Sequence, residues 1–214
     1  MKLERLSLPP FGTNTYLLFA AEPVAVVIDP ASNPDQIQMR CKARGAELKA
    51  ILLTHGHFDH IGAVAQLKRE TGAAVLISKQ DAPRLRQGDR DLAEGFGLPI
   101  PSGTEPDRLL EDGDSFSVGG LSFQFLSTPG HTPGSGCYLC ENLLFTGDTL
   151  FAQSVGRTDF PGGDQAQLMK SLGRLAKLSG DFKVLPGHEG ESTLEWERVH
   201  NPYLHLKGGE EFWY

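Results

Sequence analysis

The sequence predicts an α/β fold, and the order of its elements carries the prediction. Short apolar segments typical of buried strands alternate with segments of helical periodicity. Between residues 50 and 77 a strand, a helix and another strand follow one another, which is the order of two parallel strands joined by a crossover. β-rich units followed by a helix recur in each half of the chain. A length of 214 residues suits one domain, which we expect to span residues 1–214.

Turn and capping residues divide the N-terminal half into elements. Residues 15–29 are apolar and β-rich, and Glu22-Pro23 interrupts them, so we expect a hairpin. Asn33-Pro34 has the form of a helix N-cap followed by proline in the first turn, and this helix is expected to end at Gly45. The other elements expected in this half are a buried strand at 50–53, a helix at 60–71 and a strand at 73–77.

Residues 85–108 break this order. They are rich in glycine, proline and charge, show no clear period and are too long for an ordinary connection, so we expect an insert or a flap over a functional site. The elements expected after them are strands at 115–118, 121–126, 136–140 and 143–145, a helix at 165–178, a strand at 182–185, and a last helix opened by a capping box at 192–195.

The composition is that of an ordinary globular chain, and it argues against several functions. Lysine and arginine together number 20 and aspartate and glutamate 27, which gives a net charge of −7. This balance argues against a nucleic-acid partner, because phosphate binding usually shows as clustered cations. No apolar run approaches the ~18 residues of a membrane span, and the N-terminus lacks the apolar core of a secretory signal. We therefore expect a cytoplasmic protein with no membrane partner.

The three cysteines are expected to be reduced, since their number is odd and no export signal is seen. Cys137 and Cys140 have the C-x-x-C spacing of a redox or zinc motif. They have no second pair and fall within a predicted strand, so we expect packed, inert thiols here and at Cys41.

Metal-capable side chains follow four of the predicted strands. Loops after such strands converge on one rim of an α/β sheet, where functional residues usually gather. A glycine beside each set permits a tight turn close to a bound ion. The segment 54–60 alone holds His55, His57, Asp59 and His60. The other three are His131 after the strand at 121–126, Asp148 after 143–145 and His188 after 182–185.

These five histidines and two aspartates predict a binuclear metal site. Neutral imidazole together with carboxylate suits zinc, which we expect first, and also iron or manganese. Seven ligands exceed the needs of one tetrahedral ion, so we expect two divalent ions that share Asp148, whose carboxylate can face both. Two ions about 3.5–4 Å apart can hold a hydroxide between them. With two carboxylates, such a site stays locally cationic and suits anionic or carbonyl substrates.

Other residues stand apart from this set. His200 and His205 are expected at the surface. Asp29 follows a strand and precedes Pro30, which fits a turn residue and equally a hydrogen-bond partner of a ligand histidine. A closed structural zinc site is disfavoured, because such sites usually take four ligands and favour cysteine.

The segment 54–60 resembles the H-x-H-x-D-H signature of the metallo-β-lactamase superfamily, and three later residues match its remaining ligand positions in order. The resemblance implies an αββα sandwich, with two mixed sheets inside and helices outside. True β-lactamases of this fold are exported and depart from the signature at the Asp-His pair, so antibiotic hydrolysis is not expected. By the family pattern the first metal is bound by His55, His57 and His131, the second by Asp59, His60 and His188, and Asp148 bridges the two.

A narrower resemblance, to the short bacterial glyoxalase II-like hydrolases, rests on residues 156–164, 185–188 and 201–204. This resemblance implies cleavage of a small-molecule thioester such as S-D-lactoylglutathione. Metal-bound hydroxide would attack the carbonyl, one ion would polarise its oxygen and the other would stabilise the departing thiolate. Asp59 and Asp148 are then the catalytic carboxylates.

The chain departs from full-length glyoxalase II after its last ligand. Residues 189–214 follow His188, so we expect no counterpart of the helical extension that the resemblance implies for basic contacts to glutathione. Residues 85–108, or the partner subunit of a homodimer, are candidates to replace it. Arg157 could bind a substrate carboxylate or could instead fix its loop by pairing with Asp159.

Three other functions compete with this one. The persulfide dioxygenase-like oxidoreductases also resemble the chain at 156–160, and they imply a single iron held by His55, His131 and Asp148. Residues 186–190 favour the hydrolases. Hydrolysis of lactones or phosphodiesters at the same site is the third hypothesis, and a non-catalytic metal-binding protein is the least favoured.

Overall fold

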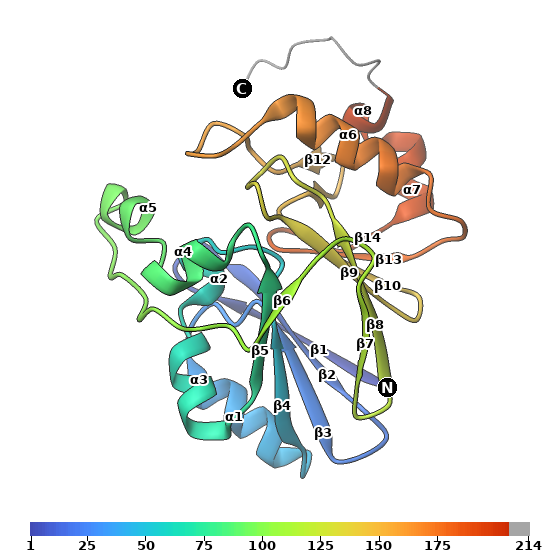
Figure 1. The fold of residues 1–214 in the computed structure, drawn as a ribbon. Coiled ribbons are helices and arrows are strands. Elements are labelled where there is room, and N and C mark those ends of the chain that lie inside the picture. Colours follow the sequence, from blue (N-terminus) through green and yellow to red (C-terminus); the bar gives the residue numbers. More distant parts are fainter. Residues whose placement is uncertain (206–214) are drawn as a thin grey trace.

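Two six-stranded sheets pack face to face, and helices cover the outer face of each (Figure 1). The structure, a computed structural model, describes residues 1–205. Its three apolar clusters lie between the first sheet and its helices, between the two sheets, and between the second sheet and its helices. The predicted α/β class and the αββα sandwich implied by the resemblance are confirmed.

The first sheet begins antiparallel and continues parallel. In order across the sheet its strands are β1 (Lys2–Leu8), β2 (Thr13–Phe19), β3 (Val24–Ile28), β4 (Glu47–Leu52), β5 (Ala74–Ser78) and β6 (Arg108–Leu110). The predicted hairpin is β2–β3, and the predicted parallel pair is β4–β5. β1 was not predicted, because it is an edge strand whose exposed and charged residues obscure the apolar pattern.

The second sheet is also mixed. Its strands, in order across the sheet, are β14 (Ser192–Thr193), β13 (Lys183–Pro186), β10 (Leu143–Gly147), β9 (Gly136–Cys140), β8 (Leu121–Ser127) and β7 (Ser115–Val118). A two-stranded ribbon, β11 (Leu150–Phe151) with β12 (Ser154–Val155), follows β10. The four strands expected between residues 115 and 145 are confirmed as β7 to β10.

The helices divide between the two outer faces and the rim. α1 (Pro34–Ala43) and α3 (Val64–Thr71) cover the first sheet, and α6 (Gln165–Ala176), α7 (Leu194–His200) and α8 (Pro202–His205) cover the second (Figure 1). Three short helices, α2 (Phe58–Ile61), α4 (Ala82–Gln87) and α5 (Arg90–Gly95), precede β6. Within residues 1–205, no helix combines the length and the apolar character needed to cross a membrane.

Two local predictions are wrong, and a third is confirmed in position but not in its side-chain hydrogen bond. The helix expected at 60–71 is broken into α2 and α3, because the Ala63 amide donates to the Pro30 carbonyl, 2.9 Å away, instead of continuing the α2 ladder. Asn33 is at the N-cap position of α1 and Pro34 is in its first turn, as predicted, but Asn33 adopts a left-handed conformation, with φ of 52°, and its side chain makes no capping hydrogen bond. Thr193, not Ser192, caps α7: its hydroxyl accepts from the Trp196 amide at 3.2 Å, while the Ser192 hydroxyl donates to the Glu197 carboxylate.

Side chains that alternate along the strands pack both into the layer between the two sheets and into the layers between the sheets and their helices. In β2, Leu17 faces the helix-covered side and Leu18 faces the other sheet, and both side chains are fully buried. Phe145 of β10 lies in the layer between the sheets, with its ring centroid 5.3 Å from that of Tyr16. Phe145 therefore connects the two sheets.

Replacing Phe145 with alanine should lower the free energy of unfolding by about 3–5 kcal/mol, since a large cavity would open in a layer closed on both sides. Chemical denaturation measures the change. The matched control is Leu109→Ala in β6, where the side chain is 40% exposed, and it should shift stability by no more than about 0.5 kcal/mol. A loss below about 1 kcal/mol for Phe145→Ala would show that the core does not depend on this ring.

Candidate metal centre

Four strands deliver the predicted ligands to one edge of the sandwich. β8, β10 and β13 point the same way, because β9 is antiparallel to both β8 and β10, and β13 is parallel to β10. Their carboxyl ends carry His131, Asp148 and His188. β4 of the other sheet brings residues 54–60 to the same edge, where the Gly136 amide donates to the Thr54 carbonyl at 2.9 Å and joins the two sheets.

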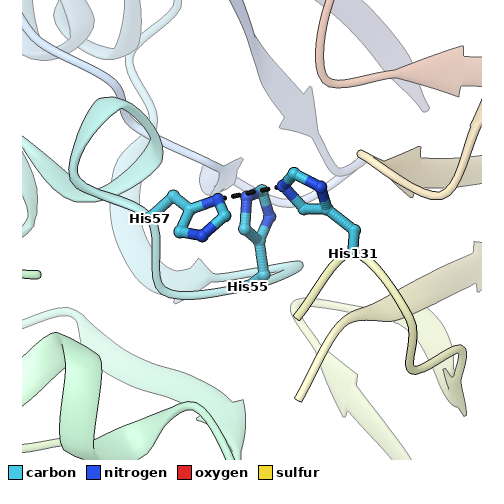
Figure 2. A group of neighbouring side chains, drawn as sticks. All are labelled: His55, His57 and His131. Carbon is cyan, nitrogen blue, oxygen red and sulfur yellow. Dashed lines mark hydrogen bonds between the residues drawn. The ribbon is translucent and has the colours of Figure 1, made fainter. Parts of the chain in front are cut away.

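His55, His57 and His131 form one cluster, in which one ligand nitrogen from each lies within 4.8 Å of the others (Figure 2). Nδ1 of His57 and Nε2 of His131 are 2.9 Å apart. His131 donates from Nδ1 to the Arg157 carbonyl at 2.7 Å. This hydrogen bond leaves Nε2 of His131 with a lone pair directed into the cluster.

Asp59, His60 and His188 form a second cluster of the same size. Nε2 of His60 and Nε2 of His188 are 3.3 Å apart, and Oδ2 of Asp59 lies 3.4 Å from Nε2 of His188. Thr13 at the start of β2 donates from its hydroxyl to Oδ2 of Asp59 at 3.0 Å, which fixes the carboxylate. No pattern in the sequence indicated this role of Thr13.

Asp148 lies between the two clusters and touches both. Its Oδ2 is 3.4 Å from Nε2 of His131 and 3.4 Å from Nε2 of His188. Its Oδ1 is 3.5 Å from Nε2 of His60. The structure therefore brings all seven predicted side chains together, with Asp148 in the central position.

Burial and opposite charge set the protonation of these groups. Burial holds the pKa of His55 and of His57 well below the usual value, with nearby imidazoles adding to the effect. Burial opposes ionisation of Asp148, but His60 and His188 outweigh it and hold its pKa well below the usual range. Burial likewise lowers the pKa of His60 and His188, yet the neighbouring carboxylates raise these values to about 9 and about 11. The second cluster thus strongly attracts positive charge, which protons or a cation can supply.

Unpartnered buried atoms show that these residues fit a metal. Within residues 1–205, three buried side-chain atoms lack a hydrogen-bond partner, namely Nε2 of His55, Nε2 of His57 and Oδ1 of Asp148. Leaving such a group unsatisfied costs about 1–3 kcal/mol. All three belong to predicted ligands, and imidazole nitrogen with carboxylate oxygen is a donor set for zinc, iron or manganese.

Asp29 is a hydrogen-bond partner of the predicted ligand His60, which decides between its two interpretations. Its Oδ2 accepts from Nδ1 of His60 at 3.0 Å and from the Thr54 hydroxyl at 2.6 Å. Its Oδ1 accepts from the Thr54 amide at 2.8 Å. Although Asp29 is grouped with His55 and His60 by distance, its oxygens are already engaged. The carboxylate keeps the proton of His60 on Nδ1 and leaves Nε2 for a metal.

Asp29→Asn should weaken binding of one metal ion by about 10–100-fold, in line with other partners of ligand histidines. The amide nitrogen would donate to Nδ1 of His60, which would move the ring proton to Nε2 and block the ligand atom. Titration of metal-free protein with Zn²⁺ measures the two affinities. The exposed Asp35→Asn is the control, and an unchanged pair of affinities in Asp29→Asn would rule out the orienting role.

Asp81 supports the rim from behind, and the sequence analysis missed it. It is fully buried. Its Oδ2 accepts from the Gly56 amide and from the Thr132 hydroxyl, both at 2.8 Å, and its Oδ1 accepts from the Gly134 amide at 2.9 Å. It therefore ties the loop of His55 and His57 to the loop of His131. The one available signal was its position shortly after a predicted strand.

Arg157 lines the same pocket as the ligands but is engaged with its own loop. Its Nε donates to Oδ1 of Asp159 at 2.6 Å, and its second guanidinium contact reaches the other carboxylate oxygen. The guanidinium also lies 4.0 Å from the ring centroid of Phe160. The loop-fixing interpretation matches this geometry, and the role as a carboxylate anchor stays a prediction.

The remaining candidates lie away from the centre. Cys137 and Cys140 are free, buried thiols on β9. Because they are three residues apart on a strand, they face opposite sides, in the outer and inner cores respectively. Burial raises the pKa of Cys137 to about 12 and that of Cys140 to about 11. The expectation of packed thiols is confirmed, and His200 and His205 are exposed as expected.

Comparison with known proteins agrees with this architecture. The metallo-β-lactamase superfamily matches residues 8–188. A hydroxyacylglutathione hydrolase, GloC, of Haemophilus influenzae is 35% identical over 211 residues, which cover 97% of this chain and 100% of the relative.

Two solved structures have the same fold. BLEG-1, described as a B3 metallo-β-lactamase, superposes with a TM-score of 0.90 at 34% identity, over 96% of this chain and 100% of that one. TTHA1623 in a di-iron-bound form superposes with a TM-score of 0.85 at 39% identity, over 94% of this chain and 100% of that one. With its αββα sandwich and its rim of histidines and aspartates, the chain belongs to the metallo-β-lactamase superfamily.

Proposed function

We propose that this protein hydrolyses thioesters at a binuclear metal centre. The observation that carries the proposal is the position of Asp148 between two clusters of three ligands each, within contact distance of both. The similarity to a hydroxyacylglutathione hydrolase over nearly the whole chain supports a thioester as the substrate. Zinc is the metal expected first, and the di-iron form of one structural neighbour supports iron as the alternative.

Two divalent cations held by these side chains would lower the pKa of a water shared between them and polarise a carbonyl oxygen. The chain's own residues aim the ligand atoms. Asp29 holds the ring of His60, the Arg157 carbonyl holds that of His131, and Thr13 holds the carboxylate of Asp59. Such partners keep ligands in place without rearrangement during the reaction.

The leaving group suits this site. A thiol with a pKa of about 8.5 departs readily as a thiolate, so the reaction needs no strong proton donor. This agrees with the engagement of both Asp59 and Asp148 in the ligand clusters, where burial opposes ionisation but neighbouring histidines outweigh it and lower the pKa of each carboxyl. Esters and amides have far more basic leaving groups and would demand an acid.

Purified protein loaded with Zn²⁺ or Fe²⁺ should release thiol from S-D-lactoylglutathione in a thiol-reagent assay. A β-lactam belongs in the same panel, because BLEG-1 is described as a β-lactamase. Thiol release without oxygen uptake supports the proposal. Oxygen consumption with glutathione persulfide and no thioester cleavage would support the dioxygenase alternative instead. Cytoplasmic location and a homodimer stay predictions.

A further inference from the structure

We propose that the preferred thioester carries an apolar group of aromatic size, which binds against phenylalanine side chains beside the metal centre. The inference rests on the proposed function and adds the substrate class. It is carried by a pocket of about 470 Å³ that opens onto the ligands His57, Asp59, His131, Asp148 and His188.

Four phenylalanines from four separate segments form one side of this pocket, and we call them the aromatic wall: Phe11, Phe58, Phe96 and Phe160. The ring centroid of Phe96 lies 5.4 Å from that of Phe11, 5.8 Å from that of Phe58 and 5.8 Å from that of Phe160. Aromatic groups pack favourably at such separations. Phe96, which follows α5, is thus the centre of the wall.

The aromatic wall reaches the metal ligands directly. The ring of Phe160 lies 5.9 Å from that of His57, and Phe58 immediately precedes Asp59 on α2. Phe151 also lines the pocket, and its ring centroid lies 6.2 Å from that of His188. A thioester carbonyl placed between the clusters would therefore have an apolar surface next to its substituent.

Two rings of the aromatic wall are partly exposed, so a ligand can contact them. Phe11 is 48% exposed and Phe96 is 45% exposed. The two are in contact with each other, so their exposed faces form a shared apolar surface. Covering such a surface stabilises a complex by about 25 cal/mol per Å², and a concave apolar patch with a few convergent polar groups is typical of a small-molecule site.

The pocket offers little to a thiol that carries several carboxylates. Among the described residues that line it, Arg157 is the one arginine or lysine, and Asp159 pairs with its guanidinium. Glu189 adds an acidic side chain to the lining. Apolar contact, more than charge, is therefore what this pocket supplies to a substrate beyond the metal ligands.

The position of Phe96 is fixed by the segment predicted as an insert or flap. Asp89, at the start of α5, accepts from Arg84 at 2.8 Å and from the Phe58 amide at 3.2 Å. Ala93 of α5 is fully buried. These contacts attach α5 to α2, the helix that carries Asp59 and His60, so the aromatic wall and the second cluster are built on one unit.

The test compares thioesters that carry an aromatic group on the acyl side or on the thiol side of the sulfur with one that carries none. S-acetyl- and S-phenylacetyl-N-acetylcysteamine vary the acyl side, and S-benzyl thioacetate varies the thiol side. We expect kcat/KM to be at least about tenfold higher for an aromatic substrate than for the acetyl compound. Phe96→Ala should reduce that ratio about tenfold, and Phe11→Ala should reduce it as well. Leu109→Ala, an exposed position outside the wall, should leave the ratio unchanged.

Binding of an uncleavable analogue separates this inference from the proposed function. S-(2-phenylethyl)-N-acetylcysteamine should bind at least about tenfold tighter than the S-ethyl compound by calorimetry, and Phe96→Ala should abolish the difference. Tight binding of the phenylethyl compound without cleavage of any thioester would support the aromatic site and overturn the hydrolase proposal. Thioester cleavage with no preference for the aromatic group, and equal binding of the two analogues, would overturn the inference and leave the hydrolase proposal standing.

Discussion

Asp148→Ala is expected to reduce kcat/KM for thioester hydrolysis by at least about 10³-fold, since removing mere partners of metal ligands already costs about 10–100-fold. The carboxylate stands 3.4 Å from His131 and from His188, so its loss would leave the two clusters without their shared ligand. Metal analysis should also show fewer than two ions per chain. Asp35→Asn, an exposed substitution on α1, is the control and should keep both activity and metal.

Retention of more than a tenth of the activity, together with a full metal complement, would contradict the bridging role of Asp148. A variant that loses activity while keeping two ions would separate the carboxylate's chemical role from its role as a ligand. Circular dichroism and the unfolding temperature identify loss of fold as a separate cause.

Gly187→Ala should have an effect of similar size through a single added methyl group. A Cβ at this position would lie 2.2 Å from Oδ1 of Asp148 and 2.8 Å from Cε1 of His60, inside the metal centre. We expect at least about a hundredfold loss of kcat/KM and weaker binding of one ion, because displaced ligands cost at least as much as displaced partners of ligands. Overpacking should also destabilise the fold by about 1–3 kcal/mol.

Gly190→Ala is the matched control for this prediction. It lies three residues further along the same loop, and its added Cβ would meet no atom within 4 Å. Metal titration and thioester kinetics on both variants provide the comparison. Equal behaviour of the two alanine variants would show that the space around Gly187 is not part of the metal centre.

The sequence predicted the parts of the centre whose chemistry is local. His55, His57, Asp59 and His60 stand within six residues, and such a density of metal-capable groups needs no tertiary information to be noticed. His131, Asp148 and His188 each follow an apolar strand, and the shared direction of β8, β10 and β13 brings them to one edge. The positions of these residues at strand ends therefore predicted that they would lie close together, although they are far apart in the chain.

Asp29 was anticipated as a partner of a ligand histidine, but Asp81 and Thr13 were not predicted, because their roles arise from contacts between distant segments. Asp81 accepts from Gly56 and from Gly134, which lies 53 positions away, and neither contact leaves a local pattern. Thr13 lies 46 positions from Asp59. Such hydrogen bonds depend on the packing of loops, which hydrophobic periodicity does not record.

Two segments of secondary structure were misjudged for related reasons. β1 carries Lys2, Glu4 and Arg5 at the edge of a sheet and buries Leu6 and Leu8, so its sequence lacks the apolar run of a buried strand. The break between α2 and α3 follows from a hydrogen bond to Pro30, in the loop after β3. Both features are decided by neighbours in space, and both adjoin the metal centre or the pocket beside it.

The most direct test of the central claim is the number of metal ions bound per chain. Metal-free protein titrated with Zn²⁺ and analysed by mass spectrometry under native conditions should bind two ions, and Asp59→Asn should bind one. Saturation of the wild-type protein at a single ion, with no loss of that ion in Asp59→Asn, would contradict a binuclear centre built from these seven side chains.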